Sequence, residues 1–174
     1  SYSKSRSGRA QQMNRGAELC HSEVLLFLHA DTEMNAASLD SVRDVMQKTY
    51  VAGGRFDVTL TGSRPLFRVI EFMINLRSRM SKISTGDQSM FVRRDLFESV
   101  GGFPNQPLME DIELSKRLKR EGSIACLRDS VITSSRRWEQ HGLMRTILLM
   151  WKLRLLYWAG VSPERLEKMY RHAR

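Results

Sequence analysis

Residues 24–32 read VLLFLHADT, and the fold prediction starts from this stretch. Five consecutive apolar residues, 24–28, are typical of a strand buried on both faces, as in a parallel sheet. Polar residues begin at His29, so Asp31 is expected at the carboxyl end of that strand. Ligands of open α/β sheets gather at this edge. The stretch therefore predicts a buried strand of a parallel sheet with a candidate site at its end.

Helical and extended patterns alternate on both sides of this strand. Helices are expected at 10–19, at 37–49, from Pro65, at 95–100, at 110–120 and from 143 onward, and further strands at 53–59, 89–93 and 126–133. Such alternation is typical of an α/β domain. We expect a Rossmann-like fold with a mixed, mostly parallel sheet and helices at the C-terminus.

The composition excludes several classes of protein. With 41% hydrophobic and 27% charged residues, the chain is neither disordered, collagenous nor coiled-coil in type. Its two cysteines, Cys20 and Cys126, form no CxxC pair, which argues against a disulfide framework and structural zinc. This cysteine usage favours a reducing compartment, so we expect a cytoplasmic protein.

The net charge of +9 is concentrated at the two ends of the chain. Residues 1–15 carry +4 and residues 136–174 carry +6, whereas the segment between them carries −1. A basic end can hold the phosphates of a nucleotide, of a nucleic acid or of an anionic membrane. The charge therefore indicates a partner that carries phosphates, but it does not distinguish a nucleotide from a nucleic acid or a membrane.

Carboxylates at the end of one strand and at the start of one helix are the first candidates for metal binding or catalysis. Asp31 can ligate a hard cation or simply cap the next helix, and its position favours neither reading. The pair Glu110 and Asp111 opens a helix, where the macrodipole favours a carboxylate by about 0.3–1 kcal/mol. Such a group suits a general base, although a plain helix cap has the same pattern.

Two polar segments can contact a ligand. The loop Gly86-Asp87-Gln88 can bond to a hydroxyl-rich molecule, or it is only a turn. Arg136-Arg137-Trp138, followed by His141, can hold a diphosphate and cover a ring, or it is a solvated basic turn.

Taken together and in order, these motifs resemble a known family. They read GRAQQMNRGAEL at 8–19, LLFLHADT at 25–32, GDQSMFVRRDLFESVGGF at 86–103, MEDIELSKRLKREG at 109–122 and SSRRW at 134–138. This series is similar to family 2 glycosyltransferases of the GT-A fold, and to a small bacterial subgroup whose metal motif is His-Ala-Asp. The resemblance covers about residues 8–160. It implies transfer of a sugar from a nucleotide-sugar donor to a hydroxyl acceptor.

The resemblance also assigns roles to single residues. Asp31 matches the acid that ligates Mg²⁺ or Mn²⁺, and His29 stands where the first acid of the motif usually is. Asp111 matches the catalytic base of inverting members, with Glu110 as the fallback base. The expected donor-binding residues are Arg9, Asn14, Gly16, His29, Asp31, Arg137 and Trp138; the sugar and acceptor loop is Gly86, Asp87 and Gln88; the metal ligands are Asp31 and His141.

The resemblance further suggests that the domain is incomplete. Relatives place nucleotide-binding strands before the Gly8-Arg9-Ala10 segment, and only seven residues precede it here. We therefore expect residues 1–142 to form a partial GT-A domain and 143–174 a C-terminal helical segment of the same domain. One alternative is a non-catalytic remnant or a partner-dependent fragment. A basic nucleic-acid-binding module is less favoured, because the chain lacks an RNP, KH or zinc-finger signature.

The segment 143–161 is mostly apolar but contains three cations, Arg145, Lys152 and Arg154. Each cation is costly inside a bilayer, so a membrane span is not expected. On a helical wheel Trp151, Leu155 and Trp158 share one side. Either this helix packs on the domain core, or it rests with the basic tail 165–174 on an anionic membrane near a lipid-linked acceptor.

Overall fold

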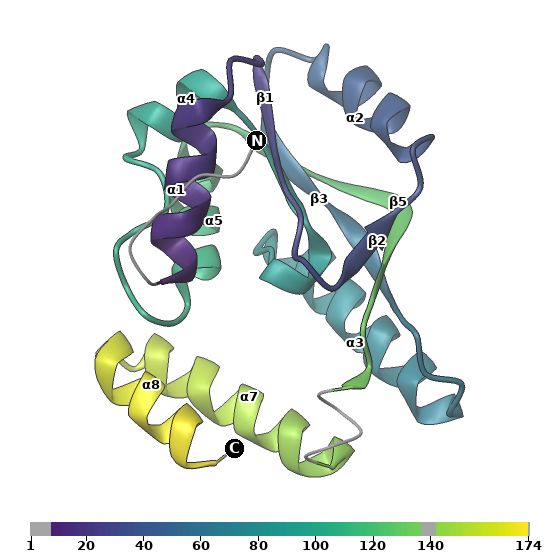
Figure 1. Cartoon of the computed structure of the whole chain (residues 1–174), viewed down its shortest axis with the longest axis vertical. Helices are drawn as coiled ribbons and strands as arrows, with labels where there is room; N and C mark the ends of the chain where they lie inside the picture. The colour runs from purple at the N-terminus through teal and green to yellow at the C-terminus, as the bar shows by residue number, and fades with distance from the viewer. Residues whose placement is uncertain (1–7, 137–141, 174) are drawn as a thin grey trace.

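A computed structural model describes residues 8–136 and 142–173 of the chain. Its elements are α1 (Arg9–Leu19), β1 (Val24–Phe27), β2 (Thr32–Met34), α2 (Ser38–Met46), β3 (Val51–Leu60), α3 (Pro65–Ser81), the 3₁₀ turn η1 (Gly86–Gln88), β4 (Met90–Arg93), α4 (Arg94–Ser99), α5 (Glu110–Glu121), β5 (Ser123–Thr133), α7 (Leu143–Trp158) and α8 (Pro163–His172). The fold is α/β with a mixed sheet and C-terminal helices, as the sequence predicts (Figure 1).

The described part of the sheet has five strands in the order β1-β4-β3-β5-β2. β3 and β5 run parallel, whereas β1 with β4, β3 with β4 and β2 with β5 are antiparallel. The expectation of a mostly parallel sheet is therefore wrong. Apolar patterning reports which faces of a strand are buried, and it carries no information on the direction of the neighbouring strand.

The strand β1 differs most from its prediction. It lies at one edge of the described sheet and pairs antiparallel with β4, with Leu25 opposite Val92. Leu25 is the buried residue of this strand, and the others are half-buried. The prediction of a strand here is confirmed, but its placement in a parallel sheet is wrong.

The short strand β2 occupies the opposite edge of the sheet. Its residues Thr32–Met34 pair with Val131–Thr133 at the end of β5, about a hundred positions later in the chain. Three residues of mixed polarity are too few to show a strand period, so the sequence predicts only a polar stretch there.

Helices cover both faces of the sheet. The helices α1, α4 and α5 lie on one face and share a core that includes Leu25, Val92, Phe97, Leu114 and Leu118. The helix α2 lies on the other face, where Val42 and Met46 pack with Phe56, Phe91 and Val131. Figure 1 shows the same arrangement, with α1, α4 and α5 together on one side and α2 on the other.

The helix α3 is held to the sheet by a partly buried ionic cluster. Asp57 of β3 forms an ion pair with the fully buried Arg55, and Arg79 of α3 reaches Asp57 Oδ2 at 2.5 Å. Arg79 also donates to the carbonyl of Cys126 in β5 at 2.9 Å. The cluster fixes the position of α3, which forms one wall of a cavity described below.

The C-terminal helices α7 and α8 pack against the start of α5. Leu153 and Leu166 are fully buried and form a cluster with Met109 and Ile112. The opposite side of α7 is exposed, and it carries Met144, Leu148, Trp151, Leu155 and Trp158. The grouping of Trp151, Leu155 and Trp158 and the packing of α7 on the core are both confirmed. None of the described helices is both long and apolar enough to cross a bilayer.

Candidate functional site

The carboxylate of Asp111 is fixed at the start of α5. Its Oδ2 accepts a hydrogen bond from the backbone N–H of Gly86 at 2.7 Å, and its Oδ1 accepts one from the N–H of Ile112 at 2.8 Å. These two donors come from η1 and from α5 itself. The predicted base and the predicted sugar loop therefore meet directly.

Arg9 of α1 joins the same cluster. It forms an ion pair with Glu110, and its Nη2 lies 3.7 Å from Asp111 Oδ2. Burial alone would lower the pKa of Arg9, but the carboxylates of Asp111 and Glu110 raise it above the ordinary arginine value. Arg9 is thus a permanent cation between two acids.

Glu110 and Asp111 differ in their access to ligands. Glu110 is 1% exposed and is engaged by Arg9, and its Oε2 has no hydrogen-bond partner among the described residues. Asp111 lines two cavities, and Glu110 is absent from the described lining of both. Asp111 is therefore the acid of the pair that can meet a substrate.

His29 follows β1 and packs against the same loop. A Cβ at position 86 would lie 2.5 Å from His29 Cε1, so the imidazole can keep its present position only beside a glycine. Burial lowers the pKa of His29, and the charge of Arg9 lowers it further, against the opposing effect of Asp87, Asp31 and Asp111. The imidazole is therefore neutral near pH 7.

Asp31 lies exposed in the turn between β1 and β2. It is close enough to His29 for its charge to raise the pKa of that imidazole. Within residues 8–136 and 142–173, no group of three acidic, histidine or cysteine side chains could hold a metal ion. Mg²⁺ commonly takes one or two protein carboxylates and completes its shell with water and substrate phosphates. Asp31 fits a metal bound in that way, and no preformed cage of described residues surrounds it. The predicted second ligand, His141, lies outside the described residues.

The predicted sugar loop contains one residue open to ligands and one that is internal. Gln88 is fully buried, and its amide bonds within the fold to Thr85 at 3.4 Å and to Asn75 at 3.3 Å. Asp87 is half-buried and lines two cavities. Gln88 thus holds the loop in shape, and Asp87 presents a carboxylate to the cavities.

The remaining predicted donor residues lie apart from this cluster. The side-chain amide of Asn14 bonds to both the carbonyl and the N–H of Phe103, at 2.8 and 2.9 Å. Gly16 lies on the exposed side of α1, where a Cβ atom would meet no described heavy atom within 4 Å. Arg137 and Trp138 fall outside the described residues.

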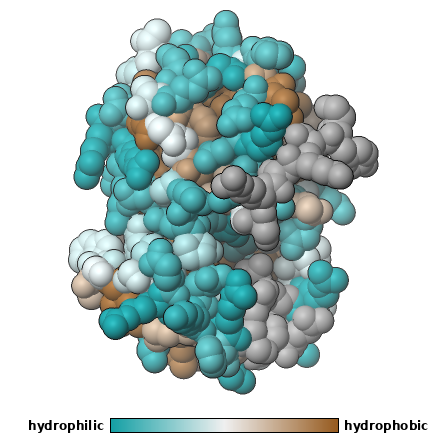
Figure 2. All heavy atoms as spheres, turned by 60° about the vertical axis from the view of Figure 1, so that its left-hand side comes forward, coloured by the Kyte–Doolittle hydropathy of each residue, from teal (hydrophilic) through white to brown (hydrophobic). Residues whose placement is uncertain are grey.

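Two neighbouring cavities share part of their lining, and Asp111 lines the first of them. The first, of about 510 Å³, lies between Arg9, Gly86, Asp111 and the C-terminal helices. Figure 2 shows the surface hollowed at the waist between the sheet layer and these helices. The second, of about 270 Å³, lies between α3 and α7. The two cavities share the residues Thr85, Asp87, Met150, Arg154 and Tyr170.

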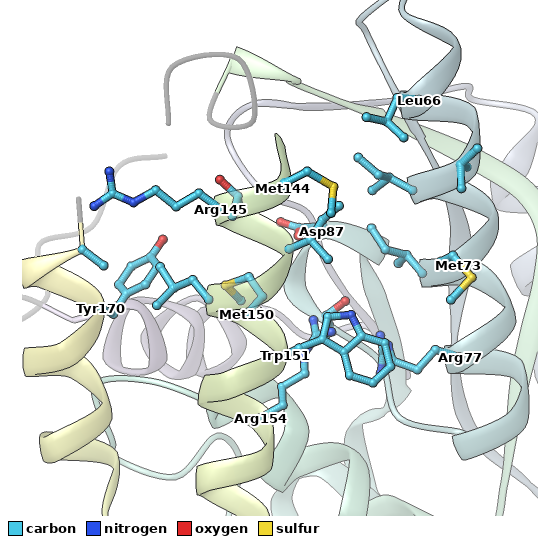
Figure 3. Close-up of a pocket in the computed structure, with 18 residues that line it drawn as sticks. Leu66, Met73, Arg77, Asp87, Met144, Arg145, Met150, Trp151, Arg154 and Tyr170 are labelled. Carbon is cyan, nitrogen blue, oxygen red and sulfur yellow. The ribbon is translucent and has the colours of Figure 1, made fainter. Parts of the chain in front are cut away.

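Two arginines in these cavities are not among the residues that the sequence predicts for the site. Arg77 of α3 and Arg154 of α7 both line the second cavity, reaching toward Trp151 from opposite sides (Figure 3). Burial and the charge of Arg154 lower the pKa of Arg77 to about 10. Burial also lowers the pKa of Arg154. Arg77 and Arg154 each follow apolar residues at helical spacing on one face of the helix. A cation at such a position is the feature of the sequence that could have identified these two residues.

The sequence matches no protein-family model, and no curated protein matches it.

Proposed function

We propose that this chain is the catalytic part of a family 2 glycosyltransferase of the GT-A fold. It would transfer a sugar from a nucleotide-sugar donor to a hydroxyl acceptor. The observation that supports this proposal most is the setting of Asp111. Its carboxylate is oriented by the N–H groups of Gly86 and Ile112 and lines a cavity of about 510 Å³.

In the proposed reaction, Asp111 takes the proton of the acceptor hydroxyl. The hydroxyl oxygen attacks the anomeric carbon of the donor, and the bond from that carbon to the diphosphate oxygen breaks. The nucleoside diphosphate leaves with the electron pair of that bond. A single displacement of this kind inverts the configuration at the anomeric carbon.

Glu110 has a different part in the proposal. Its ion pair with Arg9 holds α1 against the start of α5, beside the reacting carboxylate. Arg9 is also 3.7 Å from Asp111 Oδ2, so it helps to position the base. We therefore assign the base to Asp111, and we describe Glu110 and Arg9 as positioning residues.

The proposed cofactor is Mg²⁺ or Mn²⁺. Asp31 would hold the ion together with the phosphates of the donor, and the ion would supply positive charge to the leaving diphosphate. We place the protein in the cytoplasm, with its basic ends able to contact the inner face of the membrane.

The test uses the full-length protein with a panel of UDP-, GDP- and dTDP-sugars. We expect release of the nucleoside diphosphate that depends on Mg²⁺ or Mn²⁺ and on a hydroxyl acceptor. Asp31→Asn should abolish metal-dependent donor binding, measured by calorimetry, while leaving the unfolding midpoint unchanged. Asp44→Asn is the matched control, because Asp44 is also an exposed aspartate and lines no described cavity.

Two outcomes would refute the assignment. If Asp31→Asn binds donor in the presence of metal as well as the wild-type protein does, Asp31 is not the ligand. If no nucleotide sugar binds and RNA is retained in a salt-dependent way, the basic ends define the function instead.

A further inference from the structure

The cavity between α3 and α7 has an apolar length and a basic end. Met73 of α3 lies across from Met144 and Trp151 of α7, and Arg77 and Arg154 lie at one end (Figure 3). Val69 of α3 also lines the cavity. All four apolar side chains are substantially exposed, with Val69 at 54%. The two helices thus leave apolar surface open along a shared groove, which is unfavourable in water.

The two arginines at the end of this groove carry unused hydrogen-bond donors. Nε and Nη2 of Arg77 and Nε of Arg154 are shielded from solvent and have no hydrogen-bond partner in the described part of the chain. A buried donor without a partner costs stability relative to a paired one. Both side chains also line the groove, so an anionic group bound beside them would balance the charge of these two partly buried cations.

The charge of the groove also favours an anion. Its described lining includes three cations, Arg77, Arg145 and Arg154, against the single carboxylate of Asp87. Guanidinium groups match the oxygens of a phosphate in geometry and charge. The groove therefore combines a place for an apolar chain with a place for a phosphate.

We propose that the α3–α7 groove binds an amphiphile with one apolar chain and a phosphate head group, and that this amphiphile is the acceptor. The chain would lie along Val69, Met73 and Trp151, and the phosphate would lie against Arg77 and Arg154. Its role as acceptor rests on the proposed function, whereas its binding does not.

The position of the head group fits this role. Asp87 and Arg154 line both the groove and the cavity that contains Asp111. The charge of Asp111 also acts on both arginines. A hydroxyl on the head group would therefore lie on the side of the catalytic base. Along α3, the groove extends from Leu66 to Arg77, about 16 Å at the rise of an α-helix.

Other occupants explain less of the groove. A bilayer surface or a second copy of the chain would cover the exposed apolar side chains of α3 and α7. Arg77 and Arg154 are half-buried at the end of the groove, which a flat surface reaches less well than a single inserted head group does. A single amphiphile with a phosphate head accounts for both features.

The experiment is a calorimetric titration of the chain with dodecyl phosphate below its critical micelle concentration. We expect saturable binding with one site. Octyl phosphate should bind at least about tenfold more weakly, because it buries fewer methylene groups. Inorganic phosphate tests the head group without the chain, and dodecyl maltoside tests the chain without the charge. Both should bind at least tenfold more weakly than dodecyl phosphate, and UDP, which the proposed donor site would bind, should not displace dodecyl phosphate.

Variants of the arginines test the head-group site. Arg77→Gln and Arg154→Gln should each weaken dodecyl phosphate binding at least tenfold. Their unfolding midpoints should fall little, because each change removes donors that have no partner among the described residues, and the bond from Arg77 Nη1 to the carbonyl of Ile83 is long at 3.5 Å. Lys152→Gln is the control, since it removes a cation from an exposed position of α7 that does not line the groove.

Variants of the apolar wall keep the test decisive if an arginine variant fails to fold. Val69→Gln should weaken binding at least fivefold, because Val69 lines the groove. Phe72→Gln should bind as the wild-type chain does, because Phe72 is 63% exposed on the same helix and lies outside the groove lining. Both positions are exposed, so neither change should disturb folding.

Several results would overturn the proposal. Equal binding of dodecyl phosphate and dodecyl maltoside would show a detergent-binding patch only. Equal binding of UDP and dodecyl phosphate, with the same loss in the arginine variants, would assign the arginines to the donor. Pelleting with anionic vesicles that the arginine variants leave unchanged, without binding of dodecyl phosphate, would show a membrane surface. If dodecyl phosphate binds as expected but the protein uses no nucleotide sugar, the proposed function and the acceptor role are wrong. The proposal that the groove binds a phosphate amphiphile then still holds.

Discussion

Gly86 connects three residues of the candidate site. Its N–H donates to Asp111 Oδ2 at 2.7 Å, and the absence of a side chain leaves room for the ring of His29. Arg9 also lies close to it, with Nη1 3.5 Å from the position of a Cβ. The position of the proposed base, Asp111, therefore depends on a residue without reactive groups of its own.

We predict that Gly86→Ala reduces turnover by tenfold or more in the full-length protein. The added methyl group collides with His29 and displaces either the imidazole or the loop that positions Asp111. Steady-state kinetics with the donor identified in the nucleotide-sugar panel measures the effect.

Gly16→Ala serves as the matched control for the fold. Gly16 lies inside α1 with open space around it, so alanine should raise the free energy of unfolding by about 0.5–1 kcal/mol. Wild-type turnover in Gly86→Ala would show that this loop does not position the base.

The sequence predicts single site residues in part. Its motifs indicate Asp111 and Asp87, and both line the cavities. The partner of Arg9 could not be predicted, because Arg9 and Glu110 are 101 positions apart in the chain. Arg77 and Arg154 escape prediction because each is one of several cations on its helix, and the sequence does not show that both face the same cavity.

At the scale of elements, α7 has two faces with different environments. Leu153 is fully buried against α5 and α8, whereas Leu155, two positions later, is 63% exposed. The buried face attaches the C-terminal pair to the domain. The exposed face supplies Met144 and Trp151 to the groove.

We predict that Leu153→Ala lowers the free energy of unfolding by about 2–5 kcal/mol, because it leaves a cavity in a packed cluster. Leu155→Ala should change it by less than about 0.5 kcal/mol. Urea denaturation of the two variants beside the wild-type chain measures both values. A larger loss in Leu155→Ala than in Leu153→Ala would mean that α7 packs through its other face.

Element types follow from the sequence more closely than strand directions do. Pro65 and Pro163 begin α3 and α8, and α5 ends at Gly122, as the sequence predicts. The pairing of β1 with β4 depends instead on how distant segments return to the sheet. Local sequence patterns do not determine which distant strands pair, so they predict neither the antiparallel pairing of β1 nor the strand β2.

At the scale of the whole molecule, the candidate site is assembled from distant parts of the chain. Arg9 comes from α1, His29 from the end of β1, Gly86 and Asp87 from η1, and Asp111 from α5. The C-terminal helices complete the cavities through Arg154 and Tyr170. The sheet thus acts as a frame that brings the ends of separate elements to one place.

The central claim is that Asp111 acts as the base in sugar transfer, and one comparison tests it most directly. Asp111→Asn is compared with Asp95→Asn in the full-length protein, with turnover and donor affinity measured on the same samples. Asp95 is a close match, because it also lies in the first turn of a helix and accepts a hydrogen bond from the next N–H at 2.8 Å. It lines no described cavity.

We expect Asp111→Asn to lower turnover at least a hundredfold and to leave donor affinity within about twofold, since a base acts in the transition state and not on the bound donor. Asp95→Asn should match the wild-type protein in both measurements. Turnover that survives in Asp111→Asn would contradict the claim, and loss of turnover in Glu110→Gln instead would assign the base to Glu110.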